Sequence, residues 1–95
     1  MFEAELHRII GDALLSMQRQ GEAEVEFTRA LAIARQQQAK SWELRAAMSL
    51  ARLWRSQGIP QQARELLAPV YGWFTEGFDT RDLKEAEALL GTLPL

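Results

Sequence analysis

The sequence predicts an all-α fold in which antiparallel helical hairpins stack on one another. Apolar residues recur at the three-and-four spacing of one helix face along most of the chain, Gly and Pro interrupt that pattern at intervals, and no stretch has the alternation of a strand. The 95 residues suit a single domain over 1–95. We expect a first hairpin over about 2–39, a second over about 41–77, and a closing helix over about 80–93.

The first hairpin is predicted from two apolar stripes that are separated by Gly21. We expect Gly21 to end the first helix as its left-handed residue. Glu22 and Glu24 then fall in the first turn of the second helix, where negative charge complements the helix dipole. The first stripe consists of Phe2, Leu6, Ile9, Ile10, Ala13, Leu14 and Met17, and the second of Ala23, Phe27, Ala30, Leu31 and Ala34.

The second hairpin has clearer boundary signals. Ser41 is expected to cap the third helix, and Gly58 to end it in the left-handed conformation. Pro60 suits the first position of the fourth helix, whereas Pro69 lies inside that helix and is expected to kink it before Gly77 ends it. The closing helix is expected to be capped by Asp79 or Thr80, to be stopped by Pro94, and to turn inward Leu83, Ala86, Leu89, Leu90 and Leu93.

Composition predicts a cytoplasmic protein without a membrane segment. The chain has no Cys, which excludes disulfides and thiolate metal sites and favours a reducing compartment. Its first ten residues contain acidic side chains and lack the apolar run of a signal peptide. No apolar stretch approaches the roughly 20 residues that cross a bilayer.

The net charge of −2 conceals an acidic–basic–acidic pattern. Residues 1–34 carry three Arg and six acidic residues, residues 35–64 six basic residues and one Glu, and residues 65–95 two basic and six acidic residues. The basic middle could attract an acidic partner or a second copy of the chain. Alternatively, these charges are only solvated helix faces.

The chain also matches itself at an offset of forty residues. Ile10-Gly11 corresponds to Leu50-Ala51 and to Leu90-Gly91. We expect these small residues to allow each helix to lie close to its partner, while large neighbours fill the adjacent spaces. Ala23, Phe27 and Ala30 correspond in the same way to Ala63, Leu67 and Val70.

These residues resemble the tetratricopeptide repeat. In that family a large residue precedes a small one in helix A, and helix B carries A-x-x-x-F-x-x-A-L, which Ala23, Phe27, Ala30 and Leu31 match. The period is forty instead of about 34, and the proline that often closes helix B is absent. The resemblance implies a short TPR-like α-solenoid of two hairpins and a C-terminal capping helix.

A narrower resemblance covers the second half of the chain. QQAKSWELRAAMSLARLWRSQG, followed by ARELLAPVYGWFTEGFDTRDLKEAEALL, is similar to the C-terminal helical-repeat tail of large bacterial signalling ATPases, nucleotide cyclases and transcriptional regulators. The likeness implies that the chain is part of such a regulator. It contains no G-x-x-x-x-G-K-[ST] loop, so the catalytic activity of those proteins is not carried over.

The tetratricopeptide family binds peptides in a groove that is lined by its A helices. The resemblance implies such a groove here, and its three arginines on one side of the third helix could bind the carboxylates of an acidic peptide. Solvated arginines or contacts between subunits remain the alternatives. The candidate groove residues are Arg8, Asp12, Arg45, Met48, Arg52 and Arg55.

Four aromatic residues between Pro69 and Phe78 form a second candidate site. One helix face cannot bury all of them against one neighbour, so Tyr71 and Phe74 are expected inward, leaving Trp73 and Phe78 for the fifth helix or another chain. A self-association patch is one interpretation of this cluster, and a core cluster is the other.

The residues that carry chemistry are few. His7 is the only histidine and has no partner in the pattern that would make a metal site or a nucleophile, so we expect no enzyme activity, no cofactor, no metal and no small-molecule substrate.

The predicted function is a non-catalytic protein–protein interaction module that binds a protein or peptide, itself included. Two and a half repeats leave the face of the first helix open, so we expect a homodimer that completes the stack. The alternative is a nucleic-acid-associated regulator that uses the basic middle segment, although the acidic pI of 5.4 disfavours it.

Overall fold

The computed structural model of the chain describes residues 2–74 and 80–94, and over these residues it shows α-helices and no β-strand. The all-α prediction is therefore confirmed for the described residues. The helices are α1 (Glu3–Ser16), α2 (Gln20–Gln36), α3 (Lys40–Ser56), α4 (Pro60–Trp73) and α5 (Arg81–Leu90).

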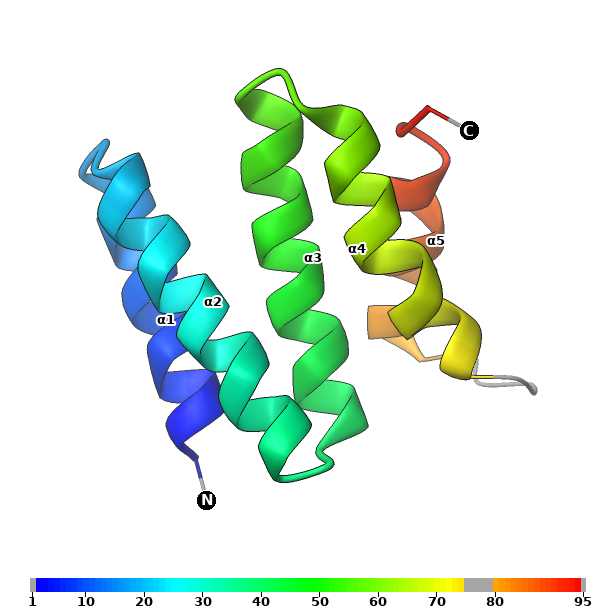
Figure 1. Cartoon of the computed structure of the whole chain (residues 1–95), viewed down its shortest axis with the longest axis horizontal. Helices are drawn as coiled ribbons and strands as arrows, with labels where there is room; N and C mark the ends of the chain where they lie inside the picture. Colours follow the sequence, from blue (N-terminus) through cyan, green and yellow to red (C-terminus); the bar gives the residue numbers. More distant parts are fainter. Residues whose placement is uncertain (1, 75–79, 95) are drawn as a thin grey trace.

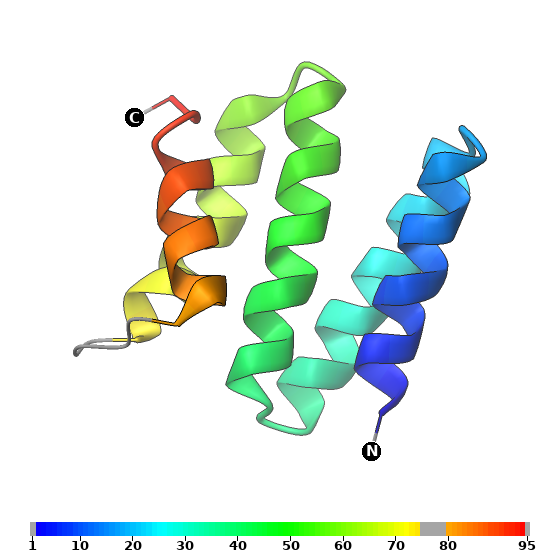
Figure 2. The same cartoon turned by 180° about the vertical axis from the view of Figure 1, so that it is seen from behind.

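The helices form two layers, with α1, α3 and α5 in one layer and α2 and α4 in the other (Figures 1 and 2). α1 and α2 are antiparallel neighbours, and so are α3 and α4. α3 lies at the centre and contacts each of the other four helices. α1 lies at one side of this arrangement and α5 at the other, so α2 and α3 are the only described helices that α1 contacts.

Three turns between the helices repeat one geometry. Gln18, Gln38 and Gly58 are left-handed, with φ of 60°, 56° and 82°. After each of them, the next amide donates to the carbonyl oxygen five residues back at 2.9 Å, which is the hydrogen bond of a Schellman motif. The donors and acceptors are Arg19 and Leu14, Ala39 and Ala34, and Ile59 and Trp54.

This geometry confirms Gly58 as a helix end and corrects the prediction for Gly21. Gly21 lies inside α2, because Gln18 already supplies the left-handed residue that ends α1. The N-cap prediction for Ser41 is also wrong, since α3 begins at Lys40 after Ala39, which makes no side-chain cap.

Three other boundary predictions are confirmed. Pro60 begins α4, and Pro69 lies inside it. The hydroxyl oxygen of Thr80 accepts from the amide of Leu83 at 3.3 Å, so Thr80 caps α5. The predicted end of the fourth helix at Gly77 is wrong, because α4 ends at Trp73 and Phe74 is already extended. Gly77 and Asp79 themselves lie outside the described residues.

The core follows the forty-residue repeat in α2 and α4. Phe27 of α2 and Leu67 of α4 occupy equivalent positions, and both are fully buried. Gly11 of α1 lies directly on the Phe27 ring, as the predicted close approach requires. Gly91 does not have the corresponding role, because α5 ends at Leu90 and leaves Gly91 exposed.

Among the described residues, no helix combines the length and the apolar character that crossing a membrane requires.

Candidate functional site

The outer side of α1 is an exposed apolar surface. α1 packs on α2 and α3 through small or half-buried residues, among them Ala4, His7, Gly11, Leu14 and Leu15, and leaves five large apolar side chains exposed. The ring of Phe2, the first of these five, also contacts Trp42 of α3 at a centroid distance of 6.2 Å. Each of these large residues keeps 39–73% of its surface exposed. The surface, called the α1 face from here on, consists of Phe2, Leu6, Ile9, Ile10 and Met17 together with the small exposed residue Ala13.

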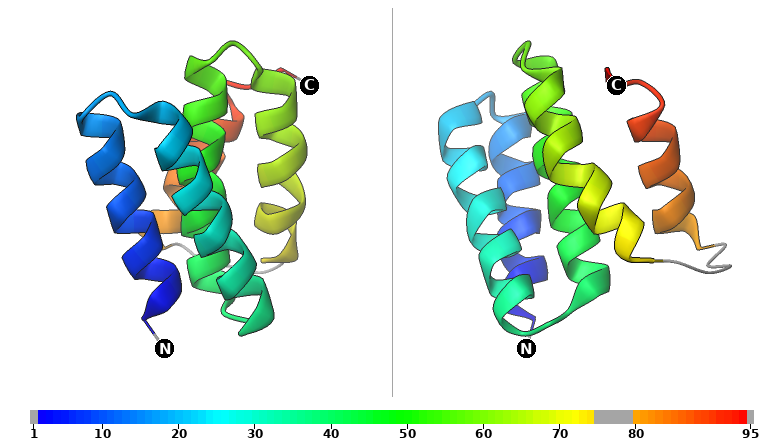
Figure 3. Two further views of the ribbon diagram at one scale, coloured as in Figure 1. Left: turned by 60° about the vertical axis from the view of Figure 1, so that its left-hand side comes forward. Right: turned by 45° about the vertical axis from the view of Figure 1, so that its right-hand side comes forward.

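The predicted first stripe is thus mainly the open face of α1 and not its packing face. Figure 3 shows α1 at the edge of the molecule, with no other described helix beyond it. Monomeric domains seldom leave contiguous apolar patches of more than a few hundred Å² in water. The α1 face is thus an exposed apolar surface on one side of the domain.

The predicted groove residues lie in a connected network of ion pairs between α1, α3 and α5. Arg45 donates to Glu5 of α1 at 3.1 Å and to Asp82 of α5 at 2.8 Å. Arg8 donates to the same Glu5 at 2.8 Å and to Asp12 at 3.0 Å. The basic middle helix thus finds acidic partners in both neighbouring helices of its own chain.

The remaining groove residues are also engaged. Arg52 lies 3.9 Å from the carboxylate of Glu85, and Arg55 donates to the hydroxyl of Thr92 at 2.8 Å. Met48 is only 2% exposed, so it offers little surface to a ligand. The structure brings four of the six predicted residues around one hollow, which is lined by Arg8, Arg45, Met48, Ser49, Arg52, Arg81, Asp82 and Glu85.

The network shifts the pKa values of its members. The hydrogen bond from Arg8 is the main cause that lowers the pKa of Glu5, and Arg45 acts in the same direction, while partial burial opposes both. Conversely, Glu5 raises the pKa of Arg8, and Asp82 is the main cause that raises the pKa of Arg45. These ion pairs persist at neutral pH, because both signs of charge are stabilised.

A Glu5→Gln substitution is expected to remove one source of pH dependence in stability. The pKa of Glu5 is lower in the folded chain than in the unfolded chain, so its stabilisation is present above the usual Glu pKa of about 4.3 and is lost as the pH falls through the lowered value. At pH 7 we expect the variant to be less stable by up to about 1 kcal/mol, since the pair is partly solvated.

Thermal unfolding followed by circular dichroism between neutral and strongly acidic pH checks this expectation. The difference between the parent and Glu5→Gln should close as the pH falls. Glu65→Gln, at an exposed position of α4, is the matched control and should change stability little at any pH. A gap between the parent and Glu5→Gln that persists in acid would contradict the role assigned to the carboxylate.

The aromatic segment at the end of α4 is partly packed and partly open. Tyr71 and Phe74 pack against the core, as predicted, and the Tyr71 hydroxyl donates to Glu87 at 3.3 Å. Loss of hydration and the charge of Glu87 both raise the pKa of Tyr71. Trp73 remains 55% exposed. Phe78, the fourth residue predicted for this patch, lies outside the described residues.

Trp73 has two neighbours of its own. Its ring meets the Phe74 ring edge-to-face at a centroid distance of 5.1 Å, and the ammonium group of Lys40 lies 5.2 Å from its ring centre. The cation–π contact ties the start of α3 to the end of α4. These contacts hold Trp73 in place while half of its surface is exposed.

Sequence reasoning missed two acidic residues that bind across helices. Glu26 of α2 accepts a hydrogen bond from His7 Nδ1 of α1 at 2.6 Å, which gives the single histidine a partner. Glu43 is 5% exposed and pairs with Arg35 at 3.0 Å and with Lys40 at 3.3 Å. Both acidic residues lie on predicted helices, but the sequence contains no signal for which helix faces which.

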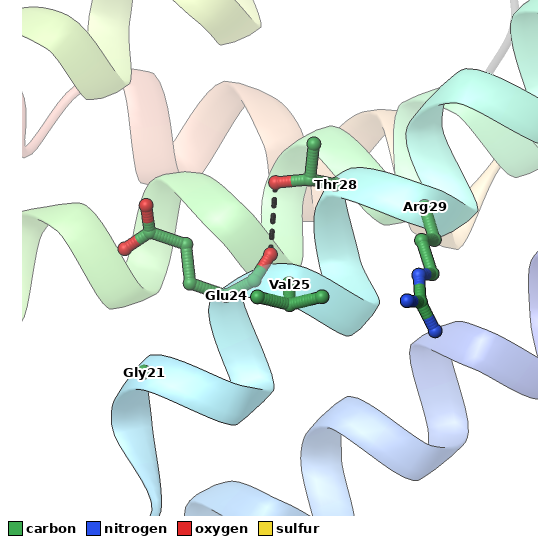
Figure 4. A pocket seen from close by; sticks show the side chains of 5 residues that line it. All are labelled: Gly21, Glu24, Val25, Thr28 and Arg29. Carbon is green, nitrogen blue, oxygen red and sulfur yellow. Dashed lines mark hydrogen bonds between the residues drawn. The ribbon is translucent and has the colours of Figure 1, made fainter.

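A shallow hollow lies on the outer surface of α2 (Figure 4). Val25 is at its centre, Thr28 donates to the carbonyl oxygen of Glu24 at 2.8 Å beside it, and Gly21 leaves space at one end. Arg29 lies at the other end and pairs with Glu26. Within residues 2–74 and 80–94, no three His, Cys, Asp or Glu side chains come together as a metal site.

Comparison with known proteins does not assign the chain to a family. A scan against protein-family models found no match, and neither the search of curated proteins nor that of solved structures found a similar chain.

Proposed function

We propose that the chain is a non-catalytic, TPR-like protein-interaction module that self-associates through the α1 face. The exposed apolar side chains of that face are the observation that carries the proposal. Burial of apolar surface is the main driving force of most protein association. A second copy of the chain presents the same surface, so self-association removes both faces from water at once.

The two-layer arrangement supports a TPR-like architecture. Each hairpin places its first helix in one layer and its second helix in the other, and α3 packs on both helices of the preceding hairpin. The forty-residue offset relates buried positions of α2 and α4, including Ala23 and Ala63, which are both fully buried. α1 is the end helix of the described stack, and no other described helix covers its outer side.

The charges favour the α1 face over the arginine groove. An acidic peptide in the groove would displace Glu5, Asp82 or Glu85 from Arg45 and Arg52. Such an exchange replaces one ion pair by another, so it gains little free energy. The same pairing reduces the positive charge that a nucleic acid would meet. The α1 face requires no such exchange.

A bacterial signalling regulator is the setting that we propose for this module. The support is the resemblance of its second half to the helical-repeat tails of such proteins. A phosphate-binding loop encoded upstream in the same gene would support this setting, and a gene without any further domain would contradict it.

The oligomeric state of two variants tests the proposed function. Ile9 of the α1 face and Trp73 of the aromatic segment are exposed by 54% and 55%, so they form a matched pair. We expect the parent to reach twice its 10.8 kDa mass in light scattering as its concentration rises. Ile9→Asp should remain monomeric, because the dimer would bury two carboxylates in an apolar interface, which weakens association by about 100-fold or more.

Trp73→Asp is expected to dimerise like the parent. The converse result, in which only Trp73→Asp is monomeric, would move the interface to the aromatic segment. A parent that stays monomeric from micromolar to millimolar concentration would contradict self-association. Circular dichroism of each variant confirms that the helices are retained.

A further inference from the structure

The exposed apolar residues of α1 have a symmetric spacing. From Phe2 to Met17 the intervals are four, three, one, three and four residues, so the sequence of intervals is the same in both directions. The centre of this pattern falls between Ile9 and Ile10. All six residues are exposed. The four from Leu6 to Ala13 lie on one side of α1, and Phe2 and Met17 flank its two ends. The members in order are Phe2, Leu6, Ile9, Ile10, Ala13 and Met17.

We propose that two copies of the chain pack α1 against α1 in antiparallel orientation, about a two-fold axis between Ile9 and Ile10. This inference rests on the proposed self-association and specifies its geometry. In this register Ile9 lies opposite Ile10 of the partner, and each remaining apolar residue also meets an apolar residue. The pairs are Phe2 with the partner's Met17 and Leu6 with the partner's Ala13.

The sizes of the facing side chains favour this orientation. Ala13 leaves a gap between Ile10 and Met17 on an otherwise bulky face. In the antiparallel register the larger Leu6 of the partner fills that gap. In a parallel dimer each residue would meet its own copy, so two Ala13 residues would face each other and leave a void, which costs stability.

The helix dipoles favour the antiparallel orientation as well, because the positive end of one α1 lies beside the negative end of the other. The charged side chains near the ends of α1 do not decide the orientation, because Glu5 is already paired with Arg8 and Arg45, and Arg19 with Glu22.

The exposed area is sufficient for a dimer of modest affinity. With 39–73% of each large residue in water, the α1 face offers on the order of 600 Å² of apolar surface per copy, compared with about 800 Å² per partner in a standard interface. α1 packs on its own domain through the opposite side, where Ala4 and Gly11 are buried. The remainder of the domain lies on that opposite side of α1 (Figure 3), apart from the contact of the Phe2 ring with Trp42 of α3.

Engineered cysteines test the register directly, because the chain has no Cys of its own. A Leu6→Cys chain is mixed with an equal amount of an Ala13→Cys chain in a glutathione redox buffer, and the disulfide-linked peptides are identified by mass spectrometry. Positions 6 and 13 of opposite copies are level in the proposed dimer, whereas two copies of position 6 are about 10 Å apart along the axis. We expect the mixed disulfide to exceed each like pair by about tenfold.

The outcomes separate the register from the proposed function. Like pairs that dominate the mixture would indicate parallel packing and overturn the register while leaving self-association in place. Light scattering that shows a dimer without an excess of mixed disulfide would also overturn the register alone. Chains that remain monomeric and gain no disulfide above a Trp73→Cys control mixture would overturn the proposed function and the register together. Both substituted positions are exposed, so the domain should keep its fold.

Discussion

A Phe27→Ala substitution is expected to lower the free energy of unfolding by about 3–5 kcal/mol. Phe27 is fully buried in α2 and is one of the largest buried side chains, so its removal leaves a cavity lined by α1 and α2. A domain of this size has a total stability of about 5–15 kcal/mol. The substitution therefore removes a large fraction of that stability.

Urea unfolding followed by circular dichroism measures this effect. Val25→Ala on the same helix is the matched control, because Val25 is 49% exposed and its truncation should cost less than about 1 kcal/mol. Phe27→Leu keeps part of the volume and provides a measurable value if Phe27→Ala does not fold. Equal losses for Val25→Ala and Phe27→Leu would contradict the position of Phe27 in the core.

Two glycine substitutions are expected to change stability in opposite directions. A Cβ on Gly11 would lie 2.5 Å from Phe27 Cε1, and the Phe27 ring is fully buried, so Gly11→Ala should destabilise the domain by about 1–3 kcal/mol. Gly21 lies in α2 with nothing within 4 Å of its added Cβ. Gly21→Ala should therefore stabilise the domain by up to about 0.5 kcal/mol, because Ala favours the helix and the gain in the first turn is smaller than in the interior.

The sign of the difference between these two variants is the readout, and it is obtained from the same urea experiment. Both substitutions add one methyl group to a helical position, so each gains helix propensity, and a loss at Gly11 reports its contact with the Phe27 ring. Similar effects of Gly11→Ala and Gly21→Ala would mean that α1 does not lie close to α2 at the Phe27 ring.

The spacing of the apolar residues was sufficient to predict the helices, but the end of the first helix was predicted at Gly21 and not at Gln18. Gly58 and Pro60 marked the third turn because each has a specific backbone preference. The first turn uses Gln18 in the left-handed conformation, which is uncommon for a residue with a side chain. The forty-residue offset could have identified the correct turn, because it aligns Gln18 with Gly58 and Ser16 with Ser56. In the structure both serines donate to a carbonyl oxygen three residues back.

The positions of the candidate groove residues could be predicted from the sequence, but the residues with which they form ion pairs could not. The sequence placed Arg45, Arg52 and Arg55 on one side of α3, and the charge pattern indicated complementary segments on both sides. That Arg45 binds both Glu5 and Asp82 depends on how α1 and α5 pack on α3. Residues separated by about forty positions meet only through that packing, so the helix period alone could not identify the pairs.

The central claim, that the α1 face joins two copies of the chain, is tested most directly by nuclear magnetic resonance of the parent in a dilution series. The proposal predicts that dilution shifts the signals of Leu6, Ile9, Ile10 and Ala13, while those of Arg45 and Trp73 stay in place. Spectra that do not change with concentration would contradict self-association. Shifts confined to the end of α4 would contradict the assignment of the contact between copies to the α1 face.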